Sequence, residues 1–385
     1  MFRNVNGVVR GMWYVLLDRY HRSRRPAPSL RVPRTTHHAL PFLSALLMLA
    51  ALSCGSGGKT PLVIYTPHGR DLLTLLKTRY EQLHPEVDLR WLDMGSQEVY
   101  DRVRSERANP QGDVWFGGPA TIFALGAADS LLEPFRPSWA EAVAPAGRGP
   151  GDLYFSAYET PAVLVYAEQA VRPEDAPQDW DDLLDPKWKG KVLIRDPIAS
   201  GTMRAVWGML IERSIRQTGD TAAGWAWLRR LDAQTKEYVL NGPLLDQKIV
   251  RQEGLVTIWD LPDIQLNKRD GLPLGYLFPR SGTPNIEDAI GVIRRAPHAA
   301  QARAFIEWVG SPAVQLLTAR EVYRLPARTD LPADSLPEWA RDVRARMIIA
   351  DMDWALLARH GAEWMRYWDE HVRGKGKAAG GTSGR

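Results

Sequence analysis

Hydrophobic and polar residues follow two alternating periods beyond residue 60, which predicts strands and helices in turn. Residues 62–65 and 87–92 have the pattern of strands, and 113–116 has the pattern of a third. Leucines recur at helical spacing over 72–83, and Pro85 ends that helix. Strands that alternate with helices favour right-handed crossovers and a mainly parallel sheet.

The same alternation returns in the second half of the chain, after a turn-rich connection between Pro173 and Pro186. Residues 191–194 and 256–260 read as strands of a second α/β unit, with a helical pattern between them. The sequence ends in a helical segment at 331–373 and a glycine-, lysine- and serine-rich tail at 374–385, for which we expect disorder.

Residues 1–53 differ in pattern from the rest of the chain. Residues 39–53 form an uncharged run of fifteen that follows Arg31 and Arg34 and is too short for a membrane span of about 20 residues. A basic segment, a short apolar run and small residues form a secretory signal, and Cys54 directly follows the run. This order resembles the bacterial lipobox, so we expect lipid attachment at Cys54 and a tether at 54–60. Burial of Cys54 in a core helix and release by nearby cleavage are the alternatives. Because residues 1–30 are long for a signal, we also expect translation to start downstream of Met1.

Charge is distributed unevenly along the sequence. Residues 1–53 contain eight arginines and one aspartate, a net charge of +7, against +4 for the whole chain, so residues 54–385 carry −3. A body of that charge is not expected to bind nucleic acid. A single cysteine forms no intrachain disulfide and no thiolate metal cluster, and we expect no cofactor and no metal site.

Several stretches resemble one family, the two-lobed solute-binding proteins of ABC importers, in the branch that carries ferric iron, thiamine, phosphonates and sugar phosphates. Residues 179–197 (DWDDLLDPKWKGKVLIRDP) are similar to its W-x-D-L-x-x-P-x-W-K-G-K element. Residues 302–317 (ARAFIEWVGSPAVQLL) resemble its late helix, and 324–328 (RLPAR) resemble its closing R-x-P-x-R. The resemblance spans 61 to about 328.

This resemblance implies an α/β, two-lobed periplasmic-binding-protein-like fold, each lobe a mixed, mainly parallel sheet flanked by helices, with hinge strands between the lobes. The boundaries we expect are 61–165 plus about 277–330 for lobe 1 and 166–276 for lobe 2. The implied protein is a monomer that captures a small solute, works with an ABC permease and ATPase, and sits in the periplasm or at the cell surface, held by lipid at Cys54.

The clearest candidate binding stretch starts the helix after residue 199. If Ser200 caps this helix, the backbone N–H groups of Gly201 and Thr202 and the helix dipole form an anion site, which Arg204 could complete. An ordinary cap with a solvated arginine is the alternative. In the first lobe, Ser96 and Gln97 repeat this arrangement, again with a plain cap as the alternative.

Other candidates lie where predicted strands end or cross. His68 could bind a metal or donate to an anion, and Gly69 would let backbone approach a ligand. Trp259 could stack on a ring or cation, and Asp260 could accept from a donor. The alternatives are a structural histidine, an interface aromatic and a helix cap. The connecting strands could also present further residues, namely Tyr158, Thr160 and Tyr276.

The residues favour one class of ligand within the family. The ferric-binding subgroup has a Tyr-Tyr pair where Ile258-Trp259-Asp260 stands here, and a glutamate near Gln97. Indole offers no hard anionic oxygen, so we expect an anion-headed organic solute such as an organophosphate or phosphonate. Ferric iron and thiamine remain alternatives.

Other classes of function are less consistent with the sequence. It has no HExxH, Walker A, G-x-S-x-G or dinucleotide-binding motif, and so no catalytic residue is assigned. A ligand-sensing domain without a transporter and a purely structural lipoprotein are the remaining alternatives.

Overall fold

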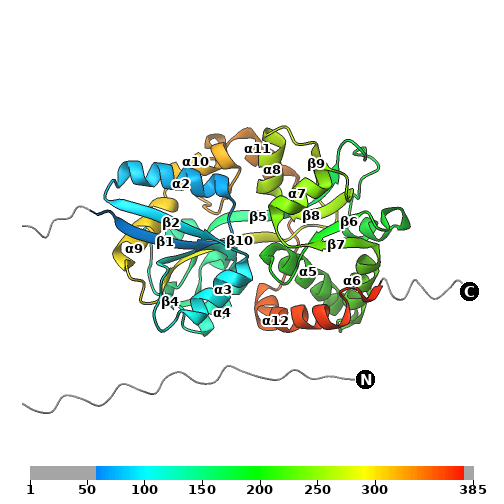
Figure 1. Cartoon of the computed structure of the whole chain (residues 1–385), viewed down its shortest axis with the longest axis horizontal. Helices are drawn as coiled ribbons and strands as arrows, with labels where there is room; N and C mark the ends of the chain where they lie inside the picture. Colours follow the sequence, from blue (N-terminus) through cyan, green and yellow to red (C-terminus); the bar gives the residue numbers. More distant parts are fainter. Residues whose placement is uncertain (1–57, 377–385) are drawn as a thin grey trace, which may run out of the picture. The chain divides into compact units, whose positions relative to one another are not determined.

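The computed structural model describes residues 58–376, and the predicted leader with Cys54 lies outside this range. The described residues form one compact unit. One sheet runs through it in the order β2-β1-β3-β10-β5-β8-β6-β7 (Figure 1). Within residues 58–376, no helix is long and apolar enough to cross a bilayer.

Lobe 1 contains the parallel strands predicted from residues 62–116. β1 pairs in parallel with both β2 and β3, and β10 returns antiparallel to β3. Its elements are β1 (Thr60–Thr66), α2 (Arg70–Leu83), β2 (Val87–Asp93), α3 (Ser96–Ser105), β3 (Val114–Pro119), α4 (Ala120–Ala128), β4 (Leu132–Glu133), β10 (Asn285–Ile293), α9 (Ala299–Val309), α10 (Pro312–Val322) and β11 (Leu325–Pro326).

Lobe 2 repeats the arrangement around β6, which pairs in parallel with β7 and β8. Its elements are β6 (Val192–Arg195), α5 (Gly201–Thr218), α6 (Ala222–Gln234), β7 (Thr235–Val239), α7 (Gly242–Val250), β8 (Val256–Asp260), α8 (Leu261–Arg269) and β9 (Leu274–Leu277). Short 3-10 turns at Trp180–Leu184 and Pro186–Trp188 form the turn-rich connection that leads into β6.

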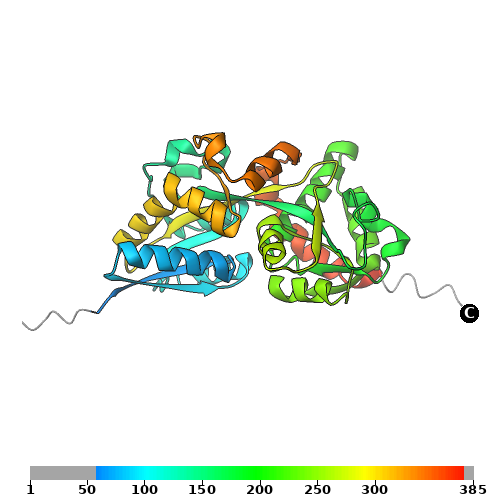
Figure 2. The same ribbon diagram turned by 90° about the horizontal axis from the view of Figure 1, so that it is seen from above.

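The long strand β5 (Phe155–Ala167) joins the two lobes, as seen from above in Figure 2. Its first half pairs with β10 up to Pro161, and its second half pairs with β8 and β9 from Ala162 onward. One strand therefore belongs to both lobes and forms a direct connection between them. The predicted lobe boundaries at 165/166 and 276/277 stay a prediction.

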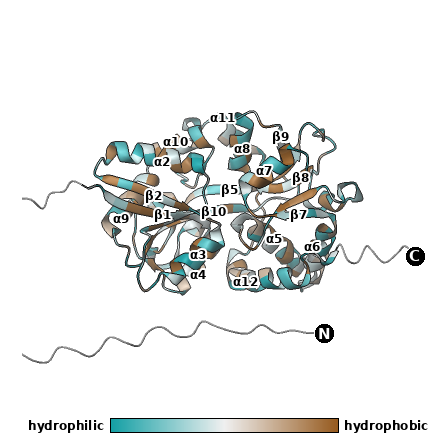
Figure 3. Cartoon of the chain, viewed as in Figure 1, coloured by the Kyte–Doolittle hydropathy of each residue, from teal (hydrophilic) through white to brown (hydrophobic). Residues whose placement is uncertain are grey.

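Apolar clusters cover both faces of the sheet in each lobe, and hydrophobic residues lie on the central strands and on the helices that cover them (Figure 3). The largest cluster, in lobe 2, includes Trp180, Trp207 and Trp368, each no more than 1 % exposed. Full burial of one such side chain contributes about 2–3 kcal/mol to folding. The fold class predicted from the sequence is confirmed.

The chain ends in α11 (Glu338–Arg346) and α12 (Trp354–His371). The buried face of α12 packs on the lobe 2 cluster and places Leu357 against Gly208 of α5. The same helix contacts α4 of lobe 1. Beyond α12, the backbone N–H groups of Gly374 and Gly376 each donate to Asp232 at 2.8 Å. The expectation of a disordered tail is therefore wrong for residues 374–376, because a buried carboxylate binds their backbone; residues 377–385 lie outside the described part.

Candidate functional site

His68 lies at the carboxyl end of β1 and is only 4 % exposed. Its ring packs edge-on against Phe116 at 4.6 Å between centroids. A Cβ at Gly117 would come within 2.5 Å of the imidazole, so glycine is required for this approach. Neither ring nitrogen of His68 has a hydrogen-bond partner among the described residues. A buried imidazole without a partner is costly unless a ligand satisfies it.

Asp288 on β10 faces His68, with 3.6 Å between Oδ2 and Nε2. Its carboxylate accepts hydrogen bonds from the hydroxyl of Thr160 at 2.5 Å and the backbone N–H of Gly118 at 3.1 Å. Burial alone would raise the pKa of Asp288, but the contact with His68 and the Thr160 hydroxyl hold it below its usual value. Burial lowers the pKa of His68. The pair is therefore a neutral imidazole beside an ionised carboxylate.

Arg324 lies next to this pair and is 3 % exposed. Its charge acts on the pKa values of His68, Asp260 and Asp288. One terminal nitrogen is 3.6 Å from Asp263, and its Nε has no hydrogen-bond partner among the described residues. A buried guanidinium with a free donor is suited to bind a carboxylate, phosphate or phosphonate.

The N-terminus of α5 meets lobe 1 at this place. Ser200 is the N-cap, as predicted, and its Oγ accepts from Met203 N at 3.2 Å. A Cβ at Gly201 would lie 2.8 Å from Ser96 Oγ and would also clash with the Pro119 ring. Two loops from opposite lobes are thus in close contact. Because Ser200 accepts the Met203 N–H, the backbone N–H groups of Gly201 and Thr202, which precede the first bonds within the helix, are the ones suited to an anion.

Asp260 ends β8 and accepts a 2.6 Å hydrogen bond from the hydroxyl of Thr202. Burial first, and then the nearby Asp263, raise the pKa of Asp260 to about 8. Asp263 itself accepts from Trp259 Nε1 at 3.2 Å. Two carboxyl groups so close favour a bound cation or hydrogen-bond donor.

We define the interlobe site as the residues that make these contacts: His68, Ser96, Thr160, Ser200, Gly201, Thr202, Asp260, Asp263, Asp288 and Arg324. A second cation, Arg195 at the end of β6, lies near Asp260 and Glu98 and is 7 % exposed.

Four predicted residues have other surroundings. Trp259 is 6 % exposed and packs within an apolar cluster, so little of its ring is accessible to a ligand. Its indole N–H instead donates to Asp263. Arg204 donates twice to the carbonyl of its own loop residue Ile198. Gln97 donates along its helix to Asp101 at 2.9 Å. Gly69 is the N-cap of α2 with φ −68°, a conformation open to any residue.

One detail of the first-lobe helix also differs. Gly95, rather than Ser96, is the N-cap of α3, because Glu98 Oε2 accepts the Gly95 N–H at 2.7 Å. Ser96 is the first helical residue, and its hydroxyl faces Gly118 and Gly201.

Sequence reasoning did not single out Arg324, Asp263, Asp288 or Arg195 as site residues. Arg324 is the first residue of the RLPAR stretch, which was used only as evidence of the family resemblance. Asp288 stands next to Glu287 in the otherwise mainly apolar strand NIEDAIGVI, where a buried acid is itself a signal that a polar partner is present.

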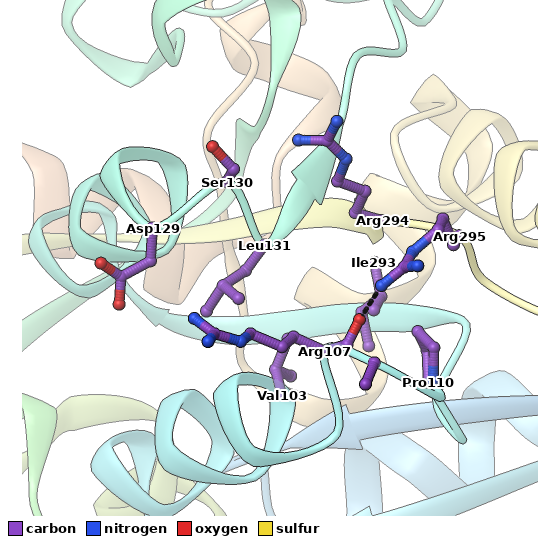
Figure 4. A pocket seen from close by; sticks show the side chains of 10 residues that line it. Val103, Arg107, Pro110, Asp129, Ser130, Leu131, Ile293, Arg294 and Arg295 are labelled. Carbon is purple, nitrogen blue, oxygen red and sulfur yellow. Dashed lines mark hydrogen bonds between the residues drawn. The ribbon is translucent and has the colours of Figure 1, made fainter.

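A separate pocket of about 520 Å³ lies in lobe 1, away from these residues. Figure 4 shows that its arginines do not converge: Arg295 is bonded to the carbonyl of Arg107, whereas Arg294 points elsewhere. The interlobe site contains buried polar atoms without partners, in His68 and Arg324, and none of the residues that line this pocket has such an atom among the described residues. Within residues 58–376, no three histidine, cysteine or acidic side chains are grouped so that they could hold a metal ion.

Comparison with known proteins is consistent with this arrangement. A probable ABC transporter periplasmic-binding protein of Sinorhizobium fredii is 26 % identical over 340 residues, 87 % of this chain and 92 % of the relative. A putative 2-aminoethylphosphonate-binding periplasmic protein of Salmonella typhimurium is 26 % identical over 268 residues, 64 % and 72 % of the two chains. Iron uptake protein A1 of Synechocystis is 23 % identical over 299 residues, 73 % and 82 % of the two chains.

Among solved structures, the periplasmic binding protein AfuA of Actinobacillus pleuropneumoniae, with fructose-6-phosphate bound, superposes with a TM-score of 0.72. It is 22 % identical and covers 82 % of this chain and 99 % of its own, which supports the fold. The model of the bacterial extracellular solute-binding protein family matches residues 76–346. The chain therefore belongs to the bacterial extracellular solute-binding proteins, the substrate-binding components of ABC transporters, which are not enzymes.

Proposed function

We propose that the interlobe site binds a small organic anion that also carries an amino group, with a phosphonate or phosphate as the anionic end. The observation that carries this proposal is the burial of Arg324 and His68 with unsatisfied nitrogens beside the carboxyl pair Asp260 and Asp263. Such a site offers both hydrogen-bond donors and carboxyl acceptors, which lie close to one another, since Arg324 is 3.6 Å from Asp263.

The anionic end of the ligand would meet Arg324, His68 and the N-terminus of α5. Arg324 supplies a permanent charge, and a neutral His68 donates one hydrogen bond. Ser96 and Ser200 add hydroxyl groups from opposite lobes, both about equally buried at 6 % exposure. A phosphonate has three oxygens, enough to accept from all of these groups.

The amino end would meet Asp260 and Asp263. Because the pKa of Asp260 is about 8 in the empty protein, this carboxyl is mostly protonated at neutral pH. An ammonium group at this place favours the carboxylate and releases its proton. The name of the Salmonella relative, which includes 2-aminoethylphosphonate, agrees with a ligand of this chemistry.

Direct coordination of ferric iron by a phenolate is the second candidate, because a relative is named for iron uptake. Tyr158 is the tyrosine beside His68, with 6.2 Å between the ring centroids. Burial raises the pKa of Tyr158 to about 12, so its phenolate form is unfavourable. This supports the organic anion over iron.

Closure of the lobes would bury the solute and present a surface to an ABC permease. The ATPase would supply the energy for transport through this permease. We propose that the protein is a monomer and that a lipid on Cys54 holds it outside the cytoplasm. Cys54 lies outside the described residues, and so this part rests on the sequence order of basic, apolar and small residues.

The direct test of ligand class is native mass spectrometry of protein isolated without denaturation, with metal analysis of the same sample. We expect a bound organic mass that contains phosphorus. Stoichiometric iron together with a visible absorption band would instead support the phenolate alternative.

A further inference from the structure

The loop that presents Ser200 to the interlobe site begins at Asp196. Asp196 is buried, with 8 % of its surface exposed, and its Oδ1 accepts a hydrogen bond from the backbone N–H of Ile198 at 2.8 Å. The backbone N–H of Ser200 donates to the Asp196 carbonyl at 3.0 Å. Asp196 therefore fixes the shape of residues 196–200 from both its side chain and its main chain.

Arg373, just beyond α12, donates to the same Asp196 Oδ1 at 2.7 Å. Its guanidinium carbon lies 4.7 Å from the centre of the Trp368 ring and 5.6 Å from that of Tyr238. Its Nε lies 3.0 Å from Asp369. An arginine held by two aromatic rings and a second carboxylate has little freedom left, so it holds its partner in one position.

The backbone that follows Arg373 is also fixed. Gly374 and Gly376 donate to Asp232, which in turn accepts the hydroxyl of Tyr238 at 2.7 Å. Gly374 has φ +71°, and a Cβ at Gly376 would lie 2.7 Å from the backbone of Ala233, so both glycines are needed for this path.

We infer that Arg373 is a positioning residue for ligand binding: through Asp196 it holds the 196–200 loop, and with it Ser200 and the N-terminus of α5, in the binding position. Arg195 and Arg204 also act electrostatically on Asp196, but among the described residues the side-chain hydrogen bond to its carboxylate comes from Arg373. Arg373 lies outside the family match at 76–346, so the C-terminal segment adds to the site a support that the matched region does not contain.

The first test needs no ligand. Hydrogen exchange of the ligand-free protein is compared between the natural chain and Arg373→Gln. We expect exchange of the 197–204 peptide to rise by about tenfold or more, while peptides from α8 and from lobe 1 stay unchanged. Arg373→Lys should show an intermediate rise, because it keeps a charge but loses the fixed guanidinium geometry. Unchanged exchange at 197–204, or an equal rise in every peptide, would overturn the inference.

The second test uses 2-aminoethylphosphonate as the probe and therefore rests on the proposed function. We expect Arg373→Gln to weaken binding by about tenfold at a temperature where circular dichroism shows that the variant is fully folded. Arg366→Gln, at an exposed position on α12, is the matched control and should bind as the natural chain does. If the natural chain does not bind this probe, the proposed ligand is wrong and the exchange experiment still decides the role of Arg373. If it binds and Arg373→Gln binds equally well, the positioning role is refuted.

Discussion

His68 Nε2 and Asp288 Oδ2 lie 3.6 Å apart at the junction of the two lobes, and both residues are buried. Burial lowers the pKa of the His68 imidazole in the folded protein. In the unfolded chain, His68 is protonated below the ordinary histidine pKa of about 6.5, whereas the folded protein binds this proton only at lower pH. Protons then bind preferentially to the unfolded state, and the free energy of unfolding falls as the pH drops from about 7 to 5.

His68→Gln should remove this contribution, because glutamine does not titrate. The expected result is a flatter dependence of the free energy of unfolding on pH between about 7 and 5, measured by urea denaturation. His371→Gln, on the exposed end of α12, is the control. An unchanged slope in His68→Gln would contradict the lowered pKa of His68 in the folded protein.

We expect Asp260 to give the free energy of unfolding a pH dependence opposite in sign to that of His68. Burial raises the pKa of Asp260 from the ordinary aspartate value of 3.8 to about 8. A raised carboxyl pKa gives stability that is present at low pH and is lost as the pH rises from about 4 to 8. Asp260→Asn keeps an oxygen for the Thr202 hydroxyl and cannot ionise. It should be more stable than the natural chain by about 1 kcal/mol or more at pH 8.5 and nearly equal at about pH 4. Asp270→Asn, at an exposed position, should show no such gain, and a gain that is equal at both pH values would contradict the prediction.

Gly201 predicts a steric limit on closure. A side chain at this position meets Ser96 Oγ and the Pro119 ring of the opposite lobe. Gly201→Val should hold the lobes apart and weaken ligand binding by at least about tenfold, because the closed state is less populated. Small-angle scattering with and without ligand measures closure. Gly361→Ala on α12, where a Cβ meets nothing within 4 Å, is the control. Closure of Gly201→Val to the same radius as the natural chain would show that this contact does not limit closure.

Cys54 predicts membrane attachment. Cys54→Ser removes the thiol to which lipid would attach, so the protein should move from the membrane fraction to the soluble fraction after cell disruption. Fractionation followed by immunoblotting measures this, and Ser53→Ala serves as a neighbouring control. Retention of Cys54→Ser in the membrane would rule out the lipid at this residue.

Much of the fold was predictable because strong local signals agree with the tertiary structure. The leucine spacing of α2 and the alternation in β2 both hold, since each element buries one face. Ser200 caps α5 as its position predicts. The cap of α3 fell one residue earlier because Glu98 binds the Gly95 N–H, a contact that competes with a serine cap.

The site was less predictable because it is built from distant parts of the chain. Asp288 on β10 accepts a hydrogen bond from Thr160 on β5, and the two residues are 128 positions apart in the sequence. Arg324, whose charge acts on Asp288, comes from a third segment of the chain. No local pattern records such pairing. Trp259 and Arg204 were predicted to face a ligand by chemical type, yet packing directs one into an apolar cluster and the other onto its own loop.

Isothermal calorimetry with a matched pair of ligands tests the central claim most directly. 2-Aminoethylphosphonate and ethylphosphonate differ only in the amino group that Asp260 and Asp263 would bind. We predict that the natural chain binds the aminophosphonate more tightly by about 2 kcal/mol and releases a proton near pH 7 as Asp260 ionises. Arg324→Gln should weaken both ligands by a similar factor, with Arg320→Gln on the exposed side of α10 as the control. Equal affinity for the two ligands, or no binding of either, would contradict the account.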